Sequence, residues 1–244
     1  MTLASILAAT FAGGVLSVVL AAAFSLTLLA RWTPRLLAYA VGVLLGVAFL
    51  DVLPEAVAGA GAPRALEACL AGVLGFFLLE KAALWRHSHA GDEHAQERKP
   101  AGFMILVGNG LHNFVDGAVV AAAFLVGPTL GWTTALGVIA HEIPHEMGDF
   151  AVLLDAGYSK RAALFWNAAS GASAVAGGVL GYAALERGRA GLPWVLALAA
   201  ASFLYIAVAD LIPELHRRGD AGGAALQVAL IGAGVATAAL AHAL

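Results

Sequence analysis

The sequence predicts an all-α integral membrane protein whose single domain, residues 1–244, crosses the bilayer eight times. Three observations predict this class. Of the 244 residues, 61% are apolar and 12% are charged, whereas a soluble domain has about 45 to 50% apolar and about 25% charged residues. Apolar stretches recur that reach the roughly 20 residues a spanning helix needs. Only short polar breaks separate these stretches, which leaves no room for a soluble domain.

The first four predicted helices occupy the first half of the chain. The stretch that begins at Leu3 is predicted to be a spanning helix and not a signal peptide, because it is too long and no basic segment precedes it. Thr33-Pro34 and Gly61-Ala62-Pro63 follow the first and second stretches, and such proline and glycine combinations end helices. The predicted spans are residues 3–30, 36–58, 65–85 and 101–127.

The last four predicted helices are delimited in the same way. Gly127-Pro128 separates the fourth helix from the fifth, and Gly191-Leu192-Pro193 precedes the seventh. Cys69 is the only cysteine, so no internal disulfide can form. The predicted spans are residues 130–154, 161–185, 193–215 and 221–244.

The distribution of lysine and arginine predicts the orientation. Ten of the 13 basic residues fall at the ends of one alternate set of loops, and three at the other. Basic residues are retained on the cytoplasmic side, so both termini are expected outside the cytosol of a cell or inner membrane. A polar loop at residues 86–100, with three histidines, then lies in the cytoplasm as either a solvated loop or a weak metal-collecting tract. The net charge of −3 argues against a nucleic-acid partner.

A short repeat suggests internal symmetry. Asp51 to Glu55 in the second helix and Asp210 to Glu214 in the seventh share the pattern Asp, two aliphatic residues, Pro, Glu. The predicted orientation places the first copy toward the outer end of its helix and the second toward the inner end. An inverted repeat has this property, and it predicts a 3+2+3 arrangement of helices with one acidic pair at each end of a path.

The fourth and fifth helices each carry one polar face. At about 100° per residue, the polar residues cover about 100° of the fourth helix and about 140° of the fifth. At 1.5 Å per residue, His112 and His141 each lie roughly 17 Å from the start of their helices, near the bilayer midplane. The sets are Asn109, His112, Asn113 and Asp116, and His141, Glu142, His145, Glu146 and Asp149.

These polar faces predict a metal site. Ionisable groups at the bilayer centre cost at least about 2.5 to 3.5 kcal/mol each, and a divalent cation offsets that cost. His112 with Asp116, and His141 with His145, have the i, i+4 spacing that lets two side chains hold one ion. Imidazole and carboxylate together favour zinc over Mg²⁺, Ca²⁺ or Cu(I). The alternative ions for this site are iron, manganese, cadmium and nickel.

These residues resemble the ZIP family of metal transporters. The pattern His-Glu-x-Pro-His-Glu-x-Gly-Asp is matched at residues 141–149, and His-Asn-x-x-Asp-Gly at residues 112–117. The resemblance implies eight helices, no enzymatic activity and zinc transport toward the cytosol. An acid that many relatives carry on the sixth helix is replaced by Ala174, which implies a weak second position. The implied first position is His112, Asp116, His141 and His145, and the second is formed or bordered by Asn113, Glu142 and Glu146.

Two alternatives stay open. His141-Glu142-Ile143-Pro144-His145 also has the His-Glu-x-x-His pattern of zinc metalloproteases. Against a protease, Pro144 is expected to interrupt the helical turn under the motif. A receptor or assembly subunit with a structural metal is the other alternative. The expected partners are a divalent metal and the lipid bilayer, and a homodimer is compatible with the sequence.

Overall fold

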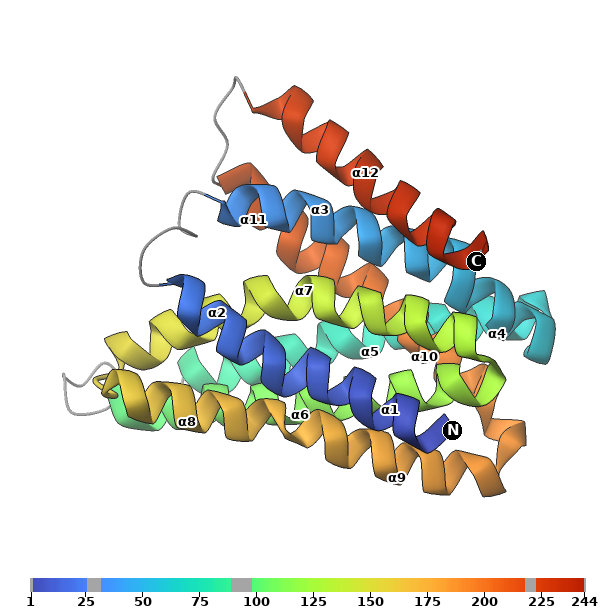
Figure 1. Ribbon diagram of the computed structural model, residues 1–244, viewed down its shortest axis with the longest axis horizontal. Coiled ribbons are helices and arrows are strands. Elements are labelled where there is room, and N and C mark those ends of the chain that lie inside the picture. The colour runs from blue at the N-terminus through green and yellow to red at the C-terminus, as the bar shows by residue number, and fades with distance from the viewer. Residues whose placement is uncertain (1, 26–31, 89–97, 218–222, 244) are drawn as a thin grey trace.

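The computed structural model describes residues 2–25, 32–88, 98–217 and 223–243, and all regular structure in these ranges is helical. The helices form eight antiparallel columns. The start of the first column and the end of the last lie at the same end of the molecule (Figure 1), as an even number of crossings requires. Seven columns are long and apolar enough to cross a membrane. The eighth, α7, is 28 residues long and carries the polar residues of the centre. The predicted class, an all-α multi-pass membrane protein, is confirmed, and the 3+2+3 arrangement with an inverted repeat stays a prediction.

Several columns are divided into shorter helices. The first four contain α1 (Thr2–Phe11), η1 (Ala12–Leu16) and α2 (Ser17–Ser25); α3 (Thr33–Gly46), η3 (Val47–Val52) and α4 (Leu53–Ala60); α5 (Ala62–Ser88); and α6 (Arg98–Val126). The last four contain α7 (Pro128–Asp155); α8 (Lys160–Gly171) and α9 (Ser173–Arg187); α10 (Leu192–Tyr205), η5 (Ile206–Leu211) and α11 (Ile212–Arg217), preceded by the short η4 (Arg189–Gly191); and α12 (Ala224–Ala243).

The helix ends next to the 86–100 loop differ from the prediction. Helix α5 continues to Ser88 and α6 begins at Arg98, so both are three residues longer there than the apolar pattern indicates. A helix can continue beyond the apolar core of the membrane into residues that are polar, and the apolar pattern does not include these residues. The rest of the loop, residues 89–97, lies outside the described residues, and the metal-collecting role of its histidines stays a prediction.

Two columns carry the same irregularity at the same place. The π-helical segments η3 and η5 each contain six residues, and each ends two residues before a proline, Pro54 or Pro213. Proline removes a backbone donor and crowds the preceding turn, and a π segment is one way for a helix to accommodate this. Pro144 was expected to break α7 in the same way, but α7 continues through it as an α-helix. That expectation was wrong.

Helix α7 runs through the middle of the bundle, with α3 and α12 on one side and α6, α8 and α9 on the other (Figure 1). Small residues bring the backbones of α6 and α9 together. A Cβ atom built on Gly117 would lie 1.9 Å from the carbonyl oxygen of Ala174, and one built on Gly177 would lie 1.9 Å from that of Phe114. Close backbone approach of this kind is how helices associate in membranes. It places α6, the helix with the first polar face, firmly against its neighbour.

Substitution of Gly117 tests this contact. Gly117→Ala should destabilise the protein by about 1 to 3 kcal/mol, because the added methyl group meets backbone that cannot move aside. Gly108→Ala, in the same helix, is the matched control, since a Cβ atom there meets nothing within 4 Å and gains the same helical propensity. Thermal unfolding in detergent is the measurement. Equal melting temperatures for the two variants would contradict the packing.

Candidate metal site

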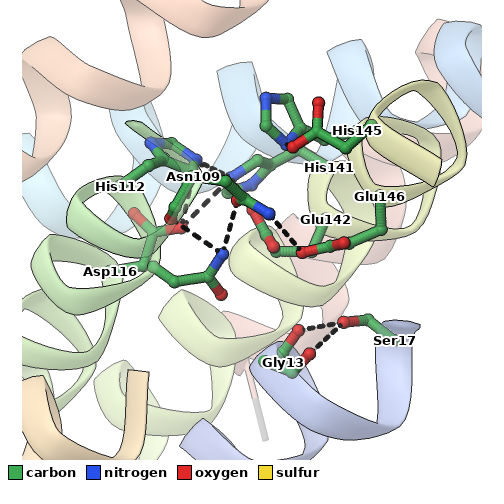
Figure 2. Close-up of polar contacts among 12 residues, drawn as sticks. Gly13, Ser17, Asn109, His112, Asp116, His141, Glu142, His145 and Glu146 are labelled. Carbon is green, nitrogen blue, oxygen red and sulfur yellow. Dashed lines mark hydrogen bonds and ion pairs between the residues drawn. The ribbon is translucent and has the colours of Figure 1, made fainter. Parts of the chain in front are cut away.

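Four side chains from two helices converge at the centre of the bundle. His112 and Asp116 lie one turn apart on α6, and His141 and Glu142 are adjacent on α7. Their ligand atoms all lie within 4.8 Å of one another, and Figure 2 shows the four side chains pointing toward a common space. All but His112 are almost fully buried, and 27% of the His112 side chain is exposed.

The distances in this group match the size of a zinc coordination shell. The Nε2 atoms of His112 and His141 are 3.2 Å apart. Asp116 Oδ2 lies 3.6 and 3.1 Å from these two nitrogens, and Glu142 Oε1 lies 3.3 Å from each. A tetrahedral zinc ion with ligands at about 2.0 to 2.1 Å separates its ligand atoms by about 3.3 to 3.4 Å. Five of the six distances between the four atoms are therefore close to the edges of such a tetrahedron, and the sixth, between the two carboxylate oxygens, is at most 4.8 Å.

A hydrogen bond prepares His141 for this role. The Nδ1 atom of His141 lies 3.0 Å from the carbonyl oxygen of Gly137, one turn earlier in α7. A carbonyl oxygen can only accept, so Nδ1 carries the proton and donates it. The lone pair of the neutral ring is then on Nε2, the atom that faces the other three ligands. Metal-binding histidines are commonly oriented by such a contact.

The charges of the group match a divalent cation. Asp116 and Glu142 supply two negative charges, and two neutral imidazoles supply none, so the complex with a divalent ion has no net charge. Among the described residues, the buried oxygens of both carboxylates accept no hydrogen bond. Buried charges without partners are costly. A cation between the four side chains removes that cost.

His145 lies outside this group, toward a cavity. Its Nδ1 atom is 3.9 Å from Asp149 Oδ2, its side chain is 43% exposed, and its ring centroid is 5.3 Å from that of His112. A cavity of about 630 Å³ extends from His112 and His141 past His145 and Asp149 to Asp210. It lies between α5, α6, α7 and the column of α10 and η5. The structure thus brings Glu142 into the group of four and places His145 beside it.

The cavity extends from the site toward the end of the bundle where α5 ends and α6 begins. Its lining residues lie in the second half of α5, the first half and middle of α6, the second half of α7, and in α10 and η5. On the opposite side of His141, a methyl group on Gly137 would lie 3.6 Å from the side chains of both Val47 and Phe203. Both of these apolar residues are fully buried. Apolar packing therefore closes the other side of the site.

A second polar group lies next to the four ligands. Glu146 is fully buried on α7, one turn after Glu142, and its Oε1 accepts a hydrogen bond of 3.1 Å from Asn109. Asn113, also buried, donates to Asn109. Sequence reasoning missed one member, Asn167 of α8, which is fully buried and contacts both Asn109 and Glu146. The signal that could have pointed to it is an asparagine within the apolar part of the predicted 161–185 span.

The two acidic pairs of the repeat lie away from this centre. Asp51 in η3 is buried and forms an ion pair with His242, near the end of α12. Glu55, one turn further along, is half-buried. Asp210 lines the cavity, whereas Glu214 is half-buried and forms an ion pair with Arg217. None of the four belongs to the group at the centre. Asp51 and Asp210 each lie in the later part of their columns, and because these two columns run in opposite directions, the two residues lie toward opposite ends of the bundle.

The fold and this group define a class: a multi-pass membrane protein with four potential ligands for a divalent cation at the centre of its helices. Residues 85–242 match the profile of the family described as ZIP Zinc transporter. The chain belongs to the ZIP family, and the resemblance found at the two motifs is confirmed.

Individual relatives agree with this assignment. Zinc transporter ZIP13 of Pongo abelii is 35% identical over 221 residues, which cover 82% of this chain and 64% of that protein. Zinc transporter ZIP10 of Homo sapiens is 39% identical over 147 residues, 56% of this chain and 18% of that protein. Metal cation symporter ZIP14 of Bos taurus is 41% identical over 114 residues. The chain thus spans less than two thirds of the length of each.

The protease alternative has no support. The family is one of transporters, and the geometry disagrees with hydrolysis. A catalytic zinc ion keeps one coordination position open for water. Glu142 Oε1 lies 3.3 Å from both histidine nitrogens, where it is placed to be a ligand. With Asp116 as the other oxygen ligand, no position is left for water.

Zinc calorimetry on the detergent-solubilised protein tests which histidines bind. His141→Ala should weaken tight binding by more than about 100-fold, because the loss of a ligand exceeds the 10- to 100-fold cost of losing an outer partner. His145→Ala is the matched comparison, one turn further on the same helix, and should cost about 10-fold or less. Equal losses for the two variants would place His145 among the ligands.

Proposed function

We propose that this protein transports a divalent metal ion, zinc in the first instance, through the bilayer toward the cytosol. The observation that carries the proposal is the group of His112, Asp116, His141 and Glu142, whose four ligand atoms are spaced for a tetrahedral zinc ion. The relatives are called zinc transporters or a metal cation symporter. A binding site at mid-membrane, reached by a cavity from one end, has the form that transport requires.

The proposed direction follows from the orientation. The excess of basic residues supports a cytosolic location for the end where α5 ends and α6 begins, with both termini outside. The cavity then faces the cytosol, and the apolar closure by Val47 and Phe203 faces outward. A divalent ion that enters down a potential of 100 mV gains about 4.6 kcal/mol, at about 2.3 kcal/mol per charge. This potential favours movement inward.

The inverted repeat that the sequence predicts would supply a way to alternate access. The columns with η3 and η5 carry matching irregular segments and matching acidic pairs, and they pack against each other, η3 against α10 and η5 against α3. Val47 of η3 and Phe203 of α10 pack at the closed side of the site, whereas η5 lines the cavity. Exchange of these two arrangements would expose the site to the opposite side, as in transporters built from inverted repeats.

The donor set favours zinc. Two imidazoles and two carboxylates suit a borderline cation, whereas Mg²⁺ and Ca²⁺ prefer shells of oxygen alone. Iron, manganese, cadmium and nickel accept the same donors and are candidate substrates. The second position, bordered by Asn113 and Glu146, has one carboxylate of its own, and we expect it to bind weakly. A homodimer stays a prediction.

Zinc flux into sealed vesicles tests the proposed function. Wild-type protein should carry Zn²⁺ to an internal zinc-sensing dye, and Asp116→Asn should lose nearly all flux, because it removes a ligand charge at almost constant shape. Asp155→Asn is the matched control, since Asp155 is exposed at the end of α7. Cleavage of a membrane peptide without zinc flux, or full flux by Asp116→Asn, would refute the proposal.

The two acidic pairs should act at different ends of the path. Asp51→Asn is expected to raise the external zinc concentration needed for half-maximal uptake, because Asp51 lies on the outer side. Asp210→Asn should instead lower the maximal rate, since Asp210 lines the proposed exit. Uptake by intact cells as a function of zinc concentration separates the two effects. Equal effects, or none, would assign these residues to helix packing.

A further inference from the structure

A chain of three asparagines and one glutamate joins α6, α7 and α8 beside the four ligands. Asn167 of α8 donates from Nδ2 to the carbonyl oxygen of Glu146 at 3.4 Å and accepts at Oδ1 from Asn109 at 3.3 Å. Asn109 also donates to Glu146 Oε1 at 3.1 Å. Asn113 in turn donates to Asn109 Oδ1 at 2.7 Å. All four residues are buried.

The acceptors in the chain set the direction of every amide. The carbonyl oxygen of Glu146 can only accept, so Asn167 must turn its NH₂ group toward α7 and its oxygen toward Asn109. Asn109 then has to donate to both Asn167 and Glu146, which leaves its own oxygen for Asn113. Asn113 donates to that oxygen and to the Asn109 carbonyl oxygen at 3.2 Å.

The direction of the chain decides which atoms stay free. Among the described residues, Asn113 Oδ1 and Glu146 Oε2 are buried without a hydrogen-bond partner, as is Glu142 Oε2. All three are oxygens with lone pairs. The Asn109 carbonyl oxygen holds the NH₂ group of Asn113, whereas Glu146 Oε1 and Asn167 Oδ1 together accept from the NH₂ group of Asn109. Without Asn167, one hydrogen of the buried Asn109 amide would have no acceptor, and the Glu146 carboxylate to which Asn109 donates would be held less firmly.

We propose that Asn167 is a positioning residue that holds Asn109, and through it the Glu146 carboxylate, in the place where they bind a cation. It acts through Asn109, so that the oxygens of Asn113 and Glu146 are kept free for an ion that lies beside the four-ligand group. The inference rests on the proposed function for its role in transport, but the binding role of Asn167 stands without it.

Asn167 also determines how much charge this place carries. An amide supplies the same acceptor as a carboxylate without the negative charge. Asn167 of α8 and Ala174 of α9 add no negative charge to the second position. Among the described residues, Glu146 is the carboxylate that this position does not share with the four-ligand group. An ion is therefore held weakly and can leave, which suits a place on a path more than a place of storage.

Zinc calorimetry on purified protein tests the role of Asn167. Wild-type protein should show one tight and one weak binding event. Asn167→Leu removes both contacts at similar size and should abolish the weak event while the tight one stays within about tenfold. Asn167→Asp keeps the acceptor for Asn109 and adds a charge, so it should retain the weak event and tighten it.

Ser170→Ala is the matched control. Ser170 lies one turn from Asn167 and donates to the carbonyl oxygen of Leu106 at 2.9 Å, so it joins α8 to α6 without touching the amide chain. This variant should bind zinc as the wild type does. Loss of the weak event in Ser170→Ala as well, or its survival in Asn167→Leu, would overturn the proposal. So would an Asn167→Asp variant that binds no better than Asn167→Leu.

Flux measurements separate this proposal from the proposed function. In vesicles, Asn167→Leu should lower the maximal rate about tenfold with little change in the zinc concentration for half-maximal rate, and Asn167→Asp should restore part of the rate. A wild type that binds zinc but moves none would refute transport alone. If Asn167→Leu does not fold, the calorimetric change in Asn167→Asp decides: an unaltered weak event would refute the positioning role.

Discussion

Charged side chains at the centre of a bilayer are the constraint on which this structure depends. Asp116, His141 and Glu142 are almost fully buried between α6 and α7, in a helical bundle whose other buried residues are mostly small and apolar. Such groups are stable there only when something compensates their charge. The compensation comes from geometry: four ligand atoms from two helices are held close enough to share one cation, and that requires the two helices to stay in register.

The remaining features of the fold serve that register. Glycine contacts seat α6 against α9, a turn-to-turn hydrogen bond orients His141, and the amide chain from Asn167 ties α6 to α7 and α8. The columns that carry the two acidic pairs contain π segments, where the backbone hydrogen bonds of the helix are irregular.

Much of this arrangement was predictable from the sequence. Apolar length and the proline and glycine breaks predicted the eight columns, and helical periodicity placed His112 and Asp116 on the polar face of one helix and His141 on that of the next. The choice between Glu142 and His145 was not predictable, because the two differ by a rotation of about 60° around the helix, at about 100° per residue, within the same polar face. Only the packing of α7 decides which of them turns toward α6.

Long-range partners were also out of reach. Asn167 carries no periodic signal, and its role depends on the side of α8 that meets α6. The pair of Asp51 with His242 joins residues almost two hundred positions apart in the chain. Pro144 fits a helix that packs on all sides, although its effect on an isolated helix is to break it. In each case tertiary contacts decide what local sequence leaves open.

The central claim is that two imidazoles and two carboxylates bind one ion in a complex of no net charge. X-ray absorption spectroscopy of the zinc-loaded protein tests it most directly, because it measures the shell around the ion itself. We expect four ligands, two imidazole nitrogens at about 2.0 to 2.1 Å and two carboxylate oxygens at about 2.0 to 2.2 Å. A shell with three imidazoles, or one made of oxygen alone, would contradict the assignment of His112, Asp116, His141 and Glu142.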